Sequence, residues 1–72
     1  MTRTRRSKEI IHEGKYAVEV DIELLYSDES WSPTMSADDA RKLEAARLAL
    51  RRGDIAEAAT YGRVFELMPV AG

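Results

Sequence analysis

Cysteine is absent from this chain and histidine occurs once, so several kinds of chemical site are excluded at the outset. Without cysteine there are no disulfides, thiolate metal sites or thiol nucleophiles, and the composition fits a reducing cytoplasm. One histidine and four glycines do not supply the usual metal-ligand, nucleophile–base or phosphate-loop sets. We therefore expect a non-enzymatic, cytoplasmic protein with no cofactor, no metal site and no catalytic residues.

Long apolar runs are also missing. No stretch of about 18 apolar residues is present, so we expect no membrane-spanning helix, and the basic opening MTRTRRSK leads into no apolar segment of a secretory signal. Charged residues make up 33% of the chain and hydrophobic residues 44%, which is a globular composition. With 72 residues, the chain is expected to form one small domain.

Charge is divided unevenly along the chain. The first eight residues hold four cations and no acid, namely Arg3, Arg5, Arg6 and Lys8, whereas residues 9–72 carry a net charge of −6 from seven basic and thirteen acidic groups. We expect residues 1–7 to form a flexible basic arm and residues 8–70 a single small domain. The arm is interpreted as a solubilising terminus, as a contact to nucleic acid, or as a contact to an acidic partner.

Alternating side chains predict a hairpin in the first half of the domain. Tyr16 to Leu24 places apolar residues on one face and acids on the other, the period of a half-buried antiparallel strand. The run from Lys8 to His12 precedes it, with Gly14 at the turn, in a register that pairs Ile11 with Tyr16 or Val18. Residues 27–36 contain Pro33 and are expected to form a loop or a short edge strand.

Capping residues predict two helices after the hairpin. Ser36 is a suitable N-cap for a helix over residues 37–52, whose apolar stripe is Ala40, Leu43, Ala46 and Leu50, and Gly53 ends it. Asp54 and Glu57 form a capping-box pattern for a second, short helix. Residues 63–68 are expected to be a third strand, with continuation of the helix as the alternative. The predicted class is α+β: an antiparallel hairpin packed on one main and one short helix.

Three features are candidates for partner binding. Glu19, Asp21 and Glu23 share the polar strand face and suit either solvent or a basic partner. Trp31 is the only tryptophan and has the character of an interface anchor, or else covers the small core. Leu48 falls off the apolar stripe of the main helix and needs another partner. The side chains of His12 and its acidic neighbours point to opposite faces of a strand, so they predict no metal or base site there.

Two partial resemblances concern toxin–antitoxin systems. The order hairpin, polar loop and helix beginning with Asp38, Asp39 and Ala40 resembles the sheet-and-helix domain of HicB-type antitoxins over residues 16–50. The segments 31–33, 51–54 and 64–70 are similar to small bacterial proteins of unassigned function linked to toxin–antitoxin genes. The segment 53–58 together with Pro69 resembles half a tetratricopeptide unit, which would make residues 63–68 helical.

These observations predict a protein-binding module, and the resemblance implies an antitoxin-like component that masks a basic partner such as a toxin. Acidic residues on the strand face favour such a partner, because complementary charge speeds association. The alternatives are a nucleic-acid-binding or regulatory protein that uses Arg3, Arg5, Arg6 and Lys8, and a self-associating domain that forms a homo-oligomer.

Overall fold

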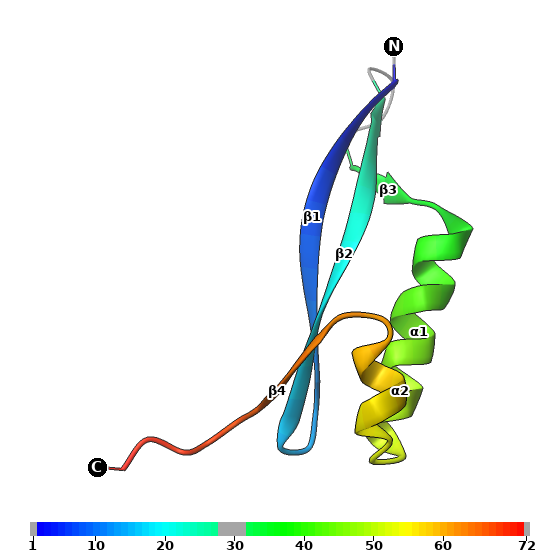
Figure 1. Ribbon diagram of the computed structural model, residues 1–72. Helices are drawn as coiled ribbons and strands as arrows, with labels where there is room; N and C mark the ends of the chain where they lie inside the picture. The colour runs from blue at the N-terminus through cyan, green and yellow to red at the C-terminus, as the bar shows by residue number, and fades with distance from the viewer. Residues whose placement is uncertain (1, 28–31, 72) are drawn as a thin grey trace.

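The computed structural model describes residues 2–27 and 32–71 as an α+β fold, in which a helical layer covers one face of an antiparallel sheet (Figure 1). The elements in chain order are β1 (Thr2–Glu13), β2 (Tyr16–Ser27), β3 (Thr34–Met35), α1 (Ala37–Arg51), α2 (Ile55–Ala59) and β4 (Arg63–Glu66). The predicted fold class is confirmed. The last segment, which the sequence left open between strand and helix, is the strand β4.

β1 and β2 form a long hairpin around the turn at Gly14 and Lys15. Gly14 has a φ of 60°, a conformation that glycine adopts without steric cost. The register pairs Ile11 with Val18, one of the two expected alternatives. β1 begins at Thr2 instead of near Lys8, so residues 2–7, expected to form a separate arm, belong to the sheet. The physical reason is that β2 runs to Ser27 and offers backbone partners to all of them.

β2 is the central strand, because β1 lies along one of its edges and both β3 and β4 lie along the other. The approach of the chain to β4 depends on Gly62. A Cβ atom at this position would lie 2.1 Å from the carbonyl oxygen of Glu19 and 2.9 Å from its carbonyl carbon. Both are backbone atoms of β2, so only glycine lets the chain pass this close.

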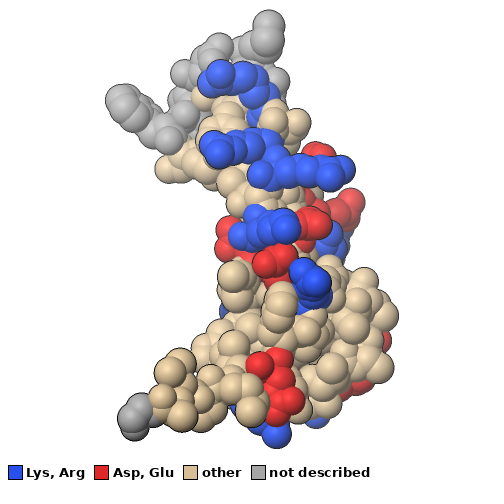
Figure 2. All heavy atoms as spheres, turned by 60° about the vertical axis from the view of Figure 1, so that its left-hand side comes forward, with Lys and Arg blue, Asp and Glu red and all other residues tan. Residues whose placement is uncertain are grey.

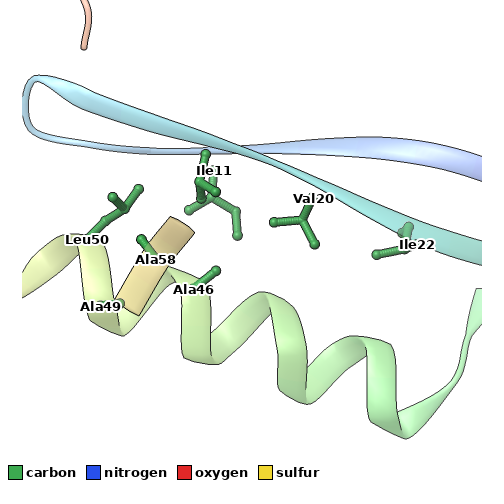
Figure 3. Close-up of a cluster of buried hydrophobic side chains, with 8 residues drawn as sticks. Ile11, Val20, Ile22, Ala46, Ala49, Leu50 and Ala58 are labelled. Atoms are coloured by element: carbon green, nitrogen blue, oxygen red, sulfur yellow. The ribbon is translucent and has the colours of Figure 1, made fainter. Parts of the chain in front are cut away.

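The core lies between the hairpin and the helices (Figure 3). Val18 and Val20 of β2 are fully buried. The other buried members of this cluster are Ile11, Ile22, Ala46, Ala49, Leu50 and Ala58. Ala40, predicted for the apolar stripe of α1, is exposed, and Ala49 is buried in the last turns of the helix instead. The helices contribute mainly alanine to this cluster, so the core is small and each of its valines matters to stability.

Side-chain caps begin both helices as the sequence predicts. The Ser36 hydroxyl accepts a hydrogen bond from the Asp39 amide at 3.1 Å, and the Asp54 carboxylate accepts one from the Glu57 amide at 3.1 Å. The reciprocal half of the expected capping box does not form, because the Asp54 amide donates to the Ala49 carbonyl at 2.8 Å; Glu57 Oε1 instead accepts a hydrogen bond from the Tyr61 hydroxyl at 2.9 Å. This bond raises the pKa of Tyr61 above its ordinary value of 10.0, and the negative charge of Glu57 adds to the shift.

The molecule is elongated. Its principal extents are 47 × 30 × 14 Å and its radius of gyration is 14.5 Å, against about 11 Å for a compact chain of this length. Figure 1 shows the reason, since the N-terminal end of β1 and the end of β2 extend beyond the start of α1. Among the described residues, no helix is long and apolar enough to cross a membrane.

Candidate protein interface

The face of the sheet opposite the helices, here called the outer face, is open over the described part of the chain. Val18, Val20 and Ile22 point toward the helices, so the alternate residues of β2 lie on the outer face. The register arranges these and their neighbours on β1 and β4 in rows across the sheet. From the turn to the open end, the rows are His12–Ala17–Phe65, Ile10–Glu19–Arg63, Lys8–Asp21, Arg6–Glu23 and Thr4–Leu25.

The middle rows of the outer face mix charges of both signs. Lys8 Nζ lies 3.3 Å from Glu19 Oε1, and the register places Lys8 beside Asp21 and Arg6 beside Glu23. Of the three acids predicted as a surface for a basic partner, Asp21 and Glu23 therefore lie opposite cations of β1, and Glu19, opposite Ile10, pairs with Lys8 of the next row. This arrangement results from the extension of β1 to Thr2, which brings the basic residues onto the sheet.

The rows nearest the hairpin turn include two large, exposed apolar side chains. Ile10 is 66% exposed and Phe65 is 41% exposed, in neighbouring rows on opposite sides of β2, where they lie opposite Glu19 and Ala17 respectively. Leu67 continues this face, because its amide donates to the Lys15 carbonyl at 2.7 Å in the line of the β4 ladder. The Arg63 guanidinium carbon lies 5.6 Å from the centre of the Phe65 ring. We call Ile10, Phe65 and Leu67 the outer apolar patch; its rim is charged.

The predicted partner-binding residues that the structure describes do not all lie on one face. Glu19, Asp21 and Glu23 lie on the outer face, whereas Leu48 is 39% exposed on α1, in the layer behind the sheet. The short helix α2 does not bury Leu48. Trp31 lies outside the residues that the structure describes.

The outer apolar patch was not predicted from the sequence, although the sequence contains a signal for it. In residues 63–67, Arg63, Phe65 and Leu67 alternate with Val64 and Glu66. This period places Phe65 and Leu67 on one face of a strand. The signal has this meaning only once the segment is known to be a strand, and the sequence left that question open.

The four cations of the basic segment occupy both faces of the hairpin. Odd-numbered residues of β1 share the face of Ile11, so Arg3 and Arg5 lie on the helix side, and Arg6 and Lys8 lie on the outer face. Figure 2 shows Lys and Arg side chains gathered along the upper part of the hairpin, above a middle zone where both signs meet. All four residues are exposed.

A polar groove of about 460 Å³ lies where the edge of β2 is open between β3 and β4, and its lining includes Arg6, Asp21, Asp38 and Lys42. Asp39 Oδ2 accepts a hydrogen bond from the Glu23 amide at 2.9 Å here, which ties the start of α1 to the sheet. Within residues 2–27 and 32–71, no group of three His, Asp or Glu side chains is placed to hold a metal ion. The groove is therefore the junction of α1 with the sheet.

His12 has a local structural partner. Its Nε2 atom lies 2.7 Å from the carbonyl oxygen of Gly14, a geometry in which the ring donates to the turn of the hairpin. This contact stabilises the turn.

Comparison with known proteins adds no assignment: the chain matched none of the family models, characterised proteins or solved structures with which it was compared. The resemblance to HicB-type antitoxins stays a prediction from the sequence.

Proposed function

We propose that this chain is a non-enzymatic protein-binding module that docks a partner on the outer face of its sheet. The observation that carries the proposal is the outer apolar patch: Ile10, Phe65 and Leu67 are large, exposed and on the face that no described element covers. A central apolar cluster with a charged rim is the usual composition of a protein interface. The partner surface is expected to be apolar at its centre and to carry both signs of charge around it.

An antitoxin-like component that masks a basic partner is the more specific form of this function. Its support is the net charge of −6 over residues 9–72 and the exposure of Asp21 and Glu23. The cations of β1 weaken this support, because Lys8 lies opposite Asp21 and Arg6 lies opposite Glu23. The patch supports the general form of the proposal more directly than the acids support the specific one.

A second candidate function is nucleic-acid binding through Arg3, Arg5, Arg6 and Lys8. The observation in its favour is that β1 holds the four cations on a long hairpin ribbon whose end extends past the helices (Figure 1). Ribbons of this kind enter the major groove in some DNA-binding proteins. An electrophoretic mobility shift at low and high salt tests this candidate, because binding through phosphate contacts weakens steeply as salt rises.

Site-specific photocrosslinking tests the primary proposal. A photoreactive phenylalanine analogue is placed at position 65, with Ala56 on the exposed side of α2 as the matched control position. We expect a defined adduct in extract of the source cells from position 65 alone, and rebinding of the purified adduct partner that Phe65→Ser weakens by about tenfold or more. Equal adducts at both positions, or rebinding unaffected by Phe65→Ser in a folded variant, would show that the patch is not the interface.

A further inference from the structure

The free edge of β1 is a second, distinct surface of the protein. Over residues 2–27 and 32–71, β1 has β2 as its neighbour on one side and no strand on the other. An uncovered edge of 12 residues is long for a small domain, and its backbone groups are able to pair with another extended chain. We propose that this edge binds an extended acidic segment of a protein partner as an additional β-strand, a proposal that rests on the protein-binding function above.

The positions of two hydrogen bonds show which backbone groups face the free edge. Leu67 donates to the Lys15 carbonyl, and the Glu23 amide donates to Asp39, so odd-numbered residues direct their backbone groups to the β4 side of β2. Bonded and non-bonded pairs alternate in an antiparallel ladder. Even-numbered residues of β2 therefore bond to β1, through its odd-numbered residues. The even-numbered residues of β1 remain for the free edge: Thr4, Arg6, Lys8, Ile10 and His12.

The charge of the edge selects the occupant. Arg3 and Arg5 lie on one face of β1, and Arg6 and Lys8 lie on the other. Successive side chains of an added strand point to alternate faces. An acidic segment therefore finds a cation whichever face its side chains take, and a shift of register by two residues keeps this complementarity.

A second copy of this chain is a poor occupant of the basic part of this edge, from Arg3 to Lys8. Antiparallel pairing of two β1 strands keeps side chains of the same face together. Pairing centred on Ser7 then sets Arg6 against Lys8, and pairing centred on Lys8 sets the two Lys8 side chains against each other. Like charges directly opposite each other destabilise a strand pair, so the cations discourage self-pairing while they favour an acidic strand.

Amide hydrogen exchange with model peptides tests this assignment. The probe is a short peptide that alternates Val and Glu, and the matched control has Gln in place of Glu. We expect the acidic peptide to bind about tenfold more tightly at low salt, with the preference shrinking as salt rises. On binding, the amides of Arg6, Lys8 and Ile10 should gain protection, whereas those of Ser7 and Glu9, already bonded to β2, should change little. Uniform protection, or none, overturns strand addition.

A backbone substitution at the edge provides a second test. Thr4→Pro removes an amide that faces the free edge, where proline is tolerated in a sheet. The matched control Thr4→Ala keeps that amide. We expect Thr4→Pro to weaken the acidic peptide by about fivefold relative to Thr4→Ala, the effect of one lost hydrogen bond. Equal affinity of the two variants, with unchanged circular dichroism, contradicts strand addition.

If Thr4→Pro prevents folding, variants that change charge and leave the backbone intact still test strand addition. Arg5→Gln with Arg6→Gln should abolish most of the preference for Glu over Gln peptides, and an unchanged preference overturns the proposal. A short DNA duplex is the third probe: if it binds and the acidic peptide does not, the cations serve nucleic acid instead. Because Phe65→Ser leaves the edge untouched, it should not change peptide binding, so failure of the edge proposal is distinguishable from failure of the outer apolar patch.

Discussion

Truncation of Val20 provides the clearest test of how this fold is held together. Val20 lies on β2, facing the helices, with none of its surface exposed. Val20→Ala removes two buried carbon groups, a loss of about 1.6 kcal/mol in transfer free energy, and the cavity left behind brings the total to about 2.5 kcal/mol. A chain of this length has a free energy of unfolding of about 4–11 kcal/mol. The midpoint of thermal unfolding should therefore fall by about 10–20 °C.

The matched control is Ile10→Ala, on the outer face of β1. Ile10 is 66% exposed, so its truncation should cost less than about 1 kcal/mol. Circular dichroism melts of the two variants measure the difference. Val20→Asp goes further, because it buries an unpaired carboxylate, and we expect it to prevent folding at 25 °C. Equal melting of the two alanine variants, or a native transition in Val20→Asp, would show that the faces of the hairpin are assigned incorrectly.

Three other contacts give predictions of their own. Gly62→Ala should lower the melting midpoint and raise amide exchange in β4, because the new Cβ collides with the backbone of β2; unchanged exchange would refute the close approach. Asp39→Ala should destabilise the protein by about 1–2 kcal/mol, as it removes the acceptor of a β2 amide, whereas Asp38→Ala at the exposed neighbouring position should have a smaller effect in the same denaturant titration. Tyr61 should titrate above 10.0. The stability that its bond to Glu57 contributes should be present below that pH and lost as the pH rises through the raised pKa. In an NMR titration, Glu57→Gln should lower the Tyr61 pKa, and an unchanged value would contradict the assigned cause.

The candidate interface shows how the meaning of a residue depends on its neighbours. Glu19 and Asp21 form part of an acidic row when β2 is considered alone, and that row suggests a basic partner. In the sheet the same residues lie beside Lys8, which belongs to another strand. Register across two strands decides whether a charged row is unopposed, and the periodicity of one strand does not contain this information.

The outer apolar patch likewise depends on strand pairing that the periodicity of one segment does not reveal. Ile10 and Phe65 are far apart in sequence and lie on one face in neighbouring rows only because β1 and β4 flank the same central strand. The assignment of β4 was itself open, since Gly62 interrupts the helix pattern but does not determine the conformation of residues 63–68. Pairing of residues 63–66 with residues 16–19 of β2 decides that they form a strand, and the close approach to β2 explains the glycine at position 62.

Local chemistry was sufficient for the starts of the helices, the turns and the buried face of β2. Ser36 and Asp54 as caps, Gly14 and Gly53 as left-handed positions, and the alternation from Tyr16 to Leu24 determined where the helices begin, where the turns lie and which face of β2 is buried. These features act through bonds and dihedral angles within a few residues, so the sequence by itself determines them. The inclusion of residues 2–7 in β1, the cross-strand opposition of charges and the free edge with its alternating backbone groups were decided only by tertiary structure, because each depends on which distant segment pairs with which, and at what register.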